Sequence, residues 1–592
     1  MRKIHILLVM LLSSVSLYAE PIGENRARQI AEDFFFTHAT RAMTYTPIAL
    51  EWAGNAIDEA SVTGSDLDNA LLYIYTRGER EGFVVIAGDS NIEPIIAYSF
   101  DTTLDTSDMA EATRAILDAW CRQVQSAREN ARPISGDTRA TTRNTDNLLY
   151  DTALWNQGEP YNREAPIYDG YRSVTGCVAT ALAIVCYYNR WPQKGVGTTP
   201  EYSYEDSYHV IRTVPENKLG RSYDYDNMLF DYNNGYTEEQ GNAVAALMKD
   251  LGTAVQMMYY YTESGAFNQN VLPALINHFD YSRGMVFEWR YSYSDDEWHE
   301  MMRENLRNYG PTYYSGQSAA GGHAFVIDGY DPNDFFHFNF GWGGTGNGYY
   351  RYPNMNFYEW QGAVLNLEPG NDSAPYRDKL LLYYDYETDP NTGEITTLYQ
   401  SITTDATKYE TGLPFNVIYN TTLNDGITPY YGDIRLVLCS KSGEVKEVLS
   451  TQHIDGLHVG TINRASQEQV TITSAIELGD RLRVQYKQQY YDEWTWARRY
   501  AEDVSYDDVV VCATAEEIAK ELIIWYYKQE HILLINTMMP LHMCVYDATD
   551  ALIQEDYIPM QYNYTLDTSA MSGSYVFTFS LGSDPYKITI KF

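Results

Sequence analysis

Cysteine and positive charge are both scarce in this chain. Six cysteines are scattered over 592 residues, too few and too irregularly spaced for a disulfide framework. Lys and Arg number 42 against 80 Asp and Glu, which gives a net charge of -38. Nucleic acids and anionic membrane surfaces repel such a chain, so neither is an expected partner. The length predicts about three or four domains rather than a single core.

Long hydrophobic runs are missing as well, apart from a short one at the N-terminus. Residues 1–19 begin with Arg2 and Lys3, continue with an apolar run that stops at Leu12, and end near Ala19. Such a run is too short for a membrane anchor, and the pattern predicts a signal peptide. No later stretch approaches the roughly 18 apolar residues of a spanning helix. We therefore expect an exported, soluble protein with no membrane span.

The motifs of several other enzyme classes are missing or incomplete. No H-E-x-x-H and no paired C-x-x-C occurs, so a zinc mechanism has no support and neither a metal nor a cofactor is expected. Residues 341–346 fit G-x-G-x-x-G, but tyrosines follow where a nucleotide-binding loop needs a helix. Residues 316–320 lack the last glycine of a nucleophile elbow, so a serine hydrolase is not indicated.

The most informative stretch is residues 173–189. Small and apolar residues follow Gly176, and a Trp-Pro pair then ends the pattern, which predicts a buried helix with Cys177 in its first turn. The free amides and the positive dipole end of a helix favour the thiolate, the nucleophilic form of cysteine. Cys186 lies nine residues further on, about half a turn out of phase with Cys177, and is expected to be a buried hydrophobic residue.

A base for this cysteine is present far downstream. Residues 321–330 and 335–344 are apolar and β-prone, and an Asp-Pro-Asn-Asp turn signal separates them. Two adjacent antiparallel strands would bring His323 beside Asn339. A cysteine followed by a distant histidine and asparagine is the order of papain-like peptidases. In that interpretation Cys177 is the nucleophile, His323 the general base and acid, and Asn339 the residue that orients the imidazole.

Two nearby residues compete for these roles. His337 shares a strand face with Asn339, but it lacks the two glycines that precede His323. Asp328 could orient an imidazole as well as an amide does, yet it lies only five residues after His323. We therefore prefer His323 as the base and Asn339 as its partner.

These segments resemble the streptopain family of secreted cysteine peptidases, which keep a papain-like core. The resemblance is carried by four motifs, at residues 156–162, 175–181, 322–329 and 339–344. One departure is Phe340, where the family usually has Trp directly after the asparagine. The resemblance extends over residues 20 to 370 and implies an α+β fold. It also implies an exported bacterial protein, secreted or held at the cell surface.

Three further residues are expected at the site, the first of them from the resemblance. Gln157 stands where the family has the glutamine whose side-chain N–H stabilises the oxyanion, together with the backbone N–H of Cys177. Removal of one such donor typically raises the barrier by about 2.7–4 kcal/mol. Trp342 is expected to cover the pair of His323 and Asn339 and to exclude water. Gly322 allows close approach of the backbone beside the imidazole.

The expected organisation combines the resemblance with changes in composition along the chain. A signal peptide (1–19) precedes an inhibitory propeptide domain (20–130), a polar and cleavable activation linker (131–146), a papain-like catalytic domain (147–370), a β-sandwich module (371–514) and a C-terminal β-sandwich module (515–592). The propeptide could instead serve only folding. The last module faintly resembles bacterial sorting domains, but a structural or substrate-contacting sandwich is the favoured interpretation.

The sequence thus predicts a secreted cysteine endopeptidase made as a zymogen. Its expected partners are protein and peptide substrates and its own propeptide, which acts as an intramolecular inhibitor. One alternative is another acyl-transfer enzyme on a papain-like core, such as a transglutaminase or an amidase. The other is an adhesin that uses its β modules and keeps a catalytically inactive peptidase domain. The complete set of Cys177, His323, Asn339 and Gln157 argues against an inactive relic.

Overall fold

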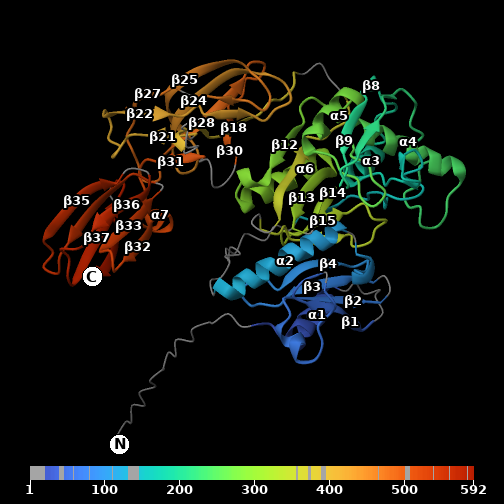
Figure 1. The fold of residues 1–592 in the computed structure, drawn as a ribbon, viewed down its shortest axis with the longest axis horizontal. Helices are drawn as coiled ribbons and strands as arrows, with labels where there is room; N and C mark the ends of the chain where they lie inside the picture. The colour runs from blue at the N-terminus through green and yellow to red at the C-terminus, as the bar shows by residue number, and fades with distance from the viewer. Residues whose placement is uncertain are drawn as a thin grey trace, which may run out of the picture. The chain divides into compact units, whose positions relative to one another are not determined.

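The computed structural model describes most of the chain, namely residues 21–38, 46–57, 59–78, 81–109, 111–130, 146–319, 321–354, 358–370, 375–388, 395–399, 401–464, 466–500, 507–537, 539–558, 561–582 and 585–592. The predicted signal peptide and the predicted linker up to residue 145 lie outside these ranges. The chain divides into two compact units, coloured from blue to red along the sequence in Figure 1. They are Met1–Ser282 with Asp296–Asn371, and Arg283–Asp295 with Asp372–Phe592.

The first unit begins with an α+β lobe. Its elements are α1 (Glu24–His38), β1 (Ile48–Gly54), β2 (Leu72–Arg77), β3 (Phe83–Ala87), β4 (Ile95–Ser99) and α2 (Glu111–Asn130). Phe35 of α1 shares one apolar core with Tyr73 of β2 and Val84 of β3. β2 and β3 are almost wholly buried, because α1 packs on both strands and α2 also contacts β2. Burial on both faces explains why these strands read as continuous apolar runs.

The rest of the first unit holds a set of helices and a larger antiparallel sheet. The helices are α3 (Cys177–Asn189), α4 (Glu238–Ala254), α5 (Val271–His278) and α6 (Asp295–Tyr309). The long strands are β13 (Thr312–Ser318), β14 (Gly321–Tyr330), β15 (Phe336–Asn339), β16 (Gly348–Tyr350) and β17 (Glu359–Leu365). Short strands are β5 (Leu148–Leu149), β6 (Ile167–Tyr168), β7 (Tyr171–Arg172), β8 (Thr198–Thr199), β9 (Tyr202–Glu205), β10 (Ile211–Val214) and β11 (Asn217–Lys218).

Helix α3 is the central helix of this part of the unit. Every residue from Val178 to Cys186 is buried, and the helix packs on β13, β14 and α4. Gly176 precedes the helix with φ 86°, and a Cβ built there would lie 2.5 Å from the sulfur of Met257, so the position requires glycine. The small and apolar sequence of the helix therefore buries its body and leaves Cys177 at its first turn. The α+β class predicted from the sequence is confirmed.

The sheet of the N-terminal lobe continues directly into the larger sheet. The strands follow the order β1-β2-β3-β4-β16-β15-β14-β13-β17, and β5 pairs with the end of β14. At the junction Tyr98 and Ala97 of β4 pair with Tyr349 and Tyr350 of β16. The rings of Tyr98 and Tyr349 stack with centroids 5.0 Å apart, and the Tyr98 hydroxyl donates to Asp331 Oδ2 at 2.9 Å. A backbone ladder thus joins two regions that the sequence separates widely.

The second unit consists mainly of strands. Its first part contains β12 (Val286–Trp289), β18 (Leu380–Leu382), β19 (Asp385–Thr388), β20 (Ile395–Tyr399), β21 (Thr403–Thr404), β22 (Pro414–Ile418), β23 (Thr422–Asn424), β24 (Tyr430–Cys439), β25 (Val445–Leu457), β26 (Ile462–Asn463), β27 (Glu468–Thr471), β28 (Arg481–Gln488), β29 (Thr495–Trp496), β30 (Arg498–Arg499) and β31 (Asp508–Val510). Its last part contains α7 (Ala515–Glu521), β32 (Ile523–Tyr527), β33 (Ile532–Thr537), β34 (Leu541–Tyr546), β35 (Leu552–Ile558), β36 (Gln561–Asp567), β37 (Ser574–Ser580) and β38 (Tyr586–Lys591).

Each part of the second unit has an apolar core of its own. In the first part Leu436 of β24 and Val484 of β28 belong to this core. In the last part the sheets β32-β33-β36 and β35-β34-β37-β38 share a core that includes Leu533, Met543 and Phe577. The predicted β-rich modules are thereby confirmed. Among the helices that the described ranges contain, none combines the length and the apolarity that a membrane crossing requires.

The junction between β4 and β16 yields a prediction about local stability. Tyr98→Phe removes the hydrogen bond to the Asp331 carboxylate, and a hydrogen bond to a charged group typically contributes about 1.5–3 kcal/mol. Amide hydrogen exchange in residues 95–99 and 348–350 should therefore accelerate by roughly tenfold or more. Tyr171→Phe, at an exposed tyrosine, is the matched control and should leave that exchange unchanged. Unchanged exchange in Tyr98→Phe would show that the hydroxyl contributes nothing to the junction.

Candidate active site

Cys177, the predicted nucleophile, lies at the first residue of α3 and is partly exposed. Two hydrogen bonds to the Gly176 carbonyl hold the first turn of the helix. Thr180 donates one from its backbone N–H at 3.1 Å and one from its hydroxyl at 2.9 Å. Thr175 N–H donates to the Gln157 carbonyl at 3.1 Å, which fixes the segment of Gln157 beside the cysteine. The sulfur thus sits at the amide-rich end of a rigid helix, where a thiolate is favoured.

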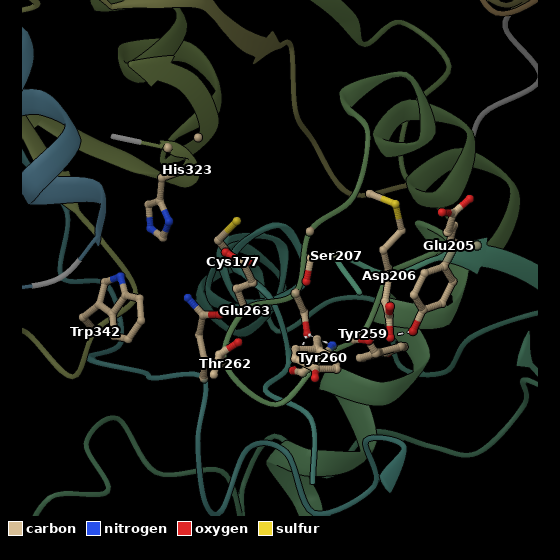
Figure 2. Close-up of a pocket in the computed structure, with 17 residues that line it drawn as sticks. Cys177, Glu205, Asp206, Ser207, Tyr259, Tyr260, Thr262, Glu263, His323 and Trp342 are labelled. Carbon is tan, nitrogen blue, oxygen red and sulfur yellow. Dashed lines mark hydrogen bonds between the residues drawn. The ribbon is translucent and has the colours of Figure 1, made fainter. Parts of the chain in front are cut away.

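His323 lies on β14 and faces the same space as Cys177 in Figure 2. Its Nε2 is 2.9 Å from the carbonyl oxygen of Phe340. A carbonyl oxygen only accepts, so Nε2 carries the proton and Nδ1 keeps a free lone pair. Trp342 lies nearly parallel to the imidazole, with ring centroids 6.2 Å apart. In this tautomer Nδ1 is the nitrogen that can accept a proton from a thiol.

The environment of His323 keeps its imidazole neutral. The side chain is only 5 % exposed, and burial lowers its pKa to about 4, although the bond to the Phe340 carbonyl opposes that shift. The α2 helix of the N-terminal lobe packs on β14, the strand that carries His323, and on β13. At neutral pH the ring therefore carries no charge in this state of the chain.

A cavity of about 390 Å³ brings the predicted residues together. Its lining includes Gln157, Cys177, Gly322, His323 and Trp342. Gln157 is buried, with 5 % of its surface exposed. Five of the six residues expected at the site from the sequence therefore share one space, although they come from distant segments of the chain.

Asn339 is the sixth, and the structure differs from the prediction there. Its side-chain Nδ2 donates to Thr152 Oγ1 at 2.9 Å and to the Ala153 carbonyl at 3.0 Å, and its Oδ1 accepts from Gly341 N–H at 3.2 Å. Across the described residues, no hydrogen bond joins Asn339 to His323. The expected contact is therefore corrected to one between His323 and the backbone carbonyl of Phe340.

The register of the strands explains this correction. Asn339 pairs with Val326, three residues beyond His323 along β14, so its side chain lies too far along the sheet. The chain then turns at Gly341, where φ is 71°, and the turn brings the Phe340 peptide to the imidazole. A backbone acceptor carries no signal in the sequence, because any residue at position 340 supplies a carbonyl.

The two competing candidates pair with each other instead. His337 Nδ1 lies 2.5 Å from Asp328 Oδ1, and Asp328 also accepts a hydrogen bond from Thr152. Burial alone would lower the pKa of His337, but the Asp328 carboxylate outweighs it and raises that pKa. Neither side chain lines the cavity. Their pair supports Asn339 through Thr152, and thus belongs to the wall behind the site.

Sequence reasoning missed the opposite wall of the cavity. Tyr204, Glu205 and Asp206 of the β9–β10 hairpin line it together with residues 258–260 and 262–265. Glu205, Asp206 and Tyr259 are labelled on this wall in Figure 2. The Tyr204 hydroxyl donates to the Tyr259 carbonyl at 2.7 Å, which joins the two segments. Asp206 is held by Arg212 at 2.7 Å and by two backbone N–H groups. Only tertiary contacts reveal this wall, because no local motif marks it.

Asn347 is a second residue that sequence reasoning missed. Its Oδ1 accepts from Phe340 N–H at 3.0 Å, which fixes the peptide next to the carbonyl that binds His323. The carbonyl of Asn347 in turn accepts from the Thr102 hydroxyl of the N-terminal lobe at 2.7 Å. The lobe is therefore connected to the imidazole through the backbone of residues 340–347.

Two segments of the chain match known protein families. Residues 155–350 match the Peptidase C10 family, and residues 19–124 match the Spi protease inhibitor. The thiol protease/hemagglutinin PrtT of Porphyromonas gingivalis is 30 % identical over 392 residues, which is 62 % of this chain and 44 % of that protein. Streptopain of Streptococcus pyogenes is 29 % identical over 334 residues, 52 % of this chain and 83 % of streptopain. The chain thus spans less than half of PrtT.

Among solved structures, a fragment of prointerpain A from Prevotella intermedia is 26 % identical, with a TM-score of 0.45. The match covers 54 % of this chain and 99 % of the fragment. The resemblance inferred from the motifs is confirmed by the family matches. Residues 155–350 are thus similar to the Peptidase C10 family of cysteine peptidases, and the segment that precedes them, residues 19–124, is similar to a protease-inhibitor domain.

Proposed function

We propose that this chain is a secreted cysteine endopeptidase, synthesised as a zymogen, in which Cys177 and His323 carry out the chemistry. The observation that carries the proposal is their shared cavity within a peptidase domain of cysteine type. The substrates would be proteins and peptides. Export through residues 1–19, the processing linker at 131–146 and the domain limits at 130, 146, 370 and 514 are parts of the same proposal.

Acyl transfer would begin with proton transfer from the Cys177 thiol to His323 Nδ1. The sulfur then attacks the peptide carbonyl, and the oxyanion is stabilised by Cys177 N–H at the helix start and by the Gln157 side chain. The imidazolium donates its new proton to the leaving amine, and the acyl-enzyme is hydrolysed by a water that His323 deprotonates. The Phe340 carbonyl would hold the Nε2 proton throughout and leave the lone pair of Nδ1 available for the thiol proton.

The N-terminal lobe would be the intramolecular inhibitor. Three features support this role: the ladder between β4 and β16, the packing of α2 on β14, and the bond from Thr102 to Asn347. A buried imidazole with a pKa near 4 disfavours the thiolate–imidazolium pair on which catalysis depends. Removal of the lobe would expose the ring to solvent and allow it to become charged.

The two alternatives differ from this proposal in what they require. A transglutaminase or an amidase would use the same cysteine and histidine but would leave peptide bonds intact. A catalytically inactive adhesin would need neither, and the shared cavity of Cys177 and His323 disfavours it. The β-rich modules could contact substrates in a peptidase as well, so their presence does not distinguish the three.

The first test of the proposal is casein cleavage by the processed wild-type protein. A thiol alkylator and Cys177→Ala should each abolish it, and His323→Ala should lower the rate by at least about 10³-fold. His337→Asn is the matched histidine control, because His337 lies outside the cavity. Cys177→Ala should also accumulate as the full-length precursor. A processed wild-type protein that cleaves no peptide bond would refute the endopeptidase assignment.

The second test addresses the support of the imidazole. Asn347→Ala removes the acceptor of Phe340 N–H, so the carbonyl that orients His323 loses its fixed position. We expect kcat to fall by roughly 10- to 100-fold with little change in KM, since misplacement of a catalytic group affects the chemical step.

Thr102→Val is the matched control for this contact. It removes the bond to the Asn347 carbonyl in the precursor, but the processed enzyme lacks position 102. Maturation should therefore accelerate while the kcat of the mature enzyme stays at the wild-type value. Equal kcat values for Asn347→Ala and wild type would exclude a positioning role for Asn347.

The third test follows the charge of His323. In the Cys177→Ala precursor its pKa should lie near 4, and after cleavage in trans by traces of wild type it should move toward the ordinary value of about 6.5. Because burial lowers the folded-state pKa, acidification from about 6.5 to 4 favours an open site that can bind the proton. NMR titration of the imidazole, assigned with His323→Ala, measures both values. An identical pKa before and after cleavage would show that the lobe does not bury the ring.

A further inference from the structure

A small cluster of potential metal ligands lies in the C-terminal β-sandwich, far along the sequence from the peptidase domain. It consists of His542 and Cys544 on β34 and Glu555 on β35, and we call it the His542 cluster. One ligand atom from each side chain lies within 4.8 Å of the others. Across the described residues, no other group of three such side chains gathers in this way.

The strand pattern explains why these side chains meet. Leu541, Met543 and Val545 of β34 point into the apolar core, so the alternate residues His542 and Cys544 share the opposite face. Cys544 pairs directly with Glu555 across the two antiparallel strands. The three ligands are therefore fixed by the sheet itself and not by a mobile loop.

The distances within the cluster match those of a tetrahedral site. The Cys544 sulfur lies 3.5 Å from His542 Nε2. Zinc–sulfur and zinc–nitrogen bonds of about 2.3 and 2.05 Å at tetrahedral angles place those two ligands about 3.6 Å apart. Glu555 Oε1 is 2.8 Å from the same nitrogen, so it must move outward by about 0.5 Å to become a ligand. Its side chain is 50 % exposed and has room for that movement.

The surroundings also favour one orientation of the imidazole. Tyr557 stacks on the His542 ring with centroids 4.5 Å apart and an interplanar angle of 17°. The stack limits tilting of the ring, and Nε2 lies within contact distance of both the sulfur and the carboxylate. His542 is 30 % exposed at its side chain, so solvent can supply a fourth ligand.

We propose that His542, Cys544 and Glu555 bind one divalent transition-metal ion of borderline softness, zinc being the best fit. Sulfur, imidazole and carboxylate donors in a four-coordinate arrangement are the set that zinc prefers. Binding releases the thiol proton of Cys544 to solvent, and the neutral His542 keeps its proton on Nδ1 so that the Nε2 lone pair reaches the metal. The thiolate and the carboxylate then balance the two charges of the ion.

The expected role of the ion is structural and does not depend on the peptidase activity. β35 is an edge strand, in the order β35-β34-β37-β38, and Leu552 and Ile553 on it are about half exposed. A metal that joins β34 to β35 would hold this edge in place, and an ion that binds the folded form stabilises it by mass action.

Cobalt titration of the full-length Cys177→Ala protein tests the proposal, since this background removes the catalytic thiol and prevents self-cleavage. We expect one Co²⁺ per chain, a thiolate-to-cobalt charge-transfer band, and displacement by Zn²⁺. Cys544→Ser should abolish the band, and His542→Ala should weaken binding by more than about 100-fold, since loss of even an outer partner costs 10- to 100-fold. Glu555→Gln should weaken binding by a smaller factor.

His453→Ala is the matched control. His453 and Asp433 form an exposed pair at 2.8 Å across antiparallel strands, like His542 and Glu555, but without a thiol. This variant should bind cobalt as the parent does. Absence of the band in the parent, its persistence in Cys544→Ser, or equal weakening in His453→Ala would each overturn the proposal.

A second measurement covers the case in which Cys544→Ser does not fold. In the Cys177→Ala protein with its cluster intact, Zn²⁺ should slow alkylation of Cys544 by more than about tenfold, because the bound thiolate is shielded. Alkylation of the buried Cys439 in the same sample provides the internal reference. An unchanged rate at Cys544 with saturating zinc would refute the site regardless of any variant.

Discussion

The hydrogen bond from His323 Nε2 to the Phe340 carbonyl is the contact on which the proposed chemistry depends. It fixes the tautomer, because a carbonyl can only accept, and it leaves Nδ1 free for the thiol. It also ties the imidazole to a peptide whose own N–H is held by Asn347. A backbone carbonyl differs in two ways from an amide side chain as an acceptor for the imidazole. It cannot rotate away from the ring, but it can be displaced by any movement of residues 340–347.

Because the orientation of the imidazole depends on the Phe340 carbonyl, an inhibitory lobe would act on the backbone of residues 340–347 instead of filling the cavity. Thr102 bonds to the carbonyl of Asn347, and β4 extends the sheet at β16 immediately afterwards. A lobe attached in this way shares a continuous ladder with the strands that carry His323 and Phe340. Its removal leaves β16 as an unpaired edge and uncovers Tyr349. Maturation would therefore change the support of the imidazole along with its access to solvent.

The sequence predicted the parts of the site that local patterns encode. The run of small residues after Gly176 required a buried helix, and the helix placed Cys177 at its start. Two glycines before His323 distinguished it from His337, which the structure pairs with Asp328. The structure gives Asn339 other hydrogen-bond partners than the expected His323, because proximity along two strands does not determine register. Side-chain identity says nothing about a backbone carbonyl, so the role of Phe340 could not be predicted.

Tertiary contacts account for what sequence reasoning missed elsewhere. The wall around Tyr204 and Tyr259 comes from two segments that meet only in the fold. The same holds for the His542 cluster, whose ligands sit on separate strands, so a search for paired C-x-x-C or H-E-x-x-H motifs passes over it. The alternation of side chains along a strand could have placed His542 and Cys544 on one face. Their position opposite Glu555 depends on the register of β34 with β35, which the sequence alone does not give.

The cysteines of the chain show how burial protects free thiols. None of the six forms a disulfide in the structure, and Cys121, Cys186 and Cys439 are buried with raised pKa values, to about 12 for Cys186 and about 11 for Cys439. Burial keeps these sulfurs protonated and out of reach, which suppresses both oxidation and exchange. Cys177 differs because it is partly exposed and lines the cavity. Cys544 differs for another reason, since an imidazole and a carboxylate face its sulfur from outside the core. The Cys544 thiol is itself buried, and the proposed metal ion would bind it as the thiolate while holding the edge of the sheet.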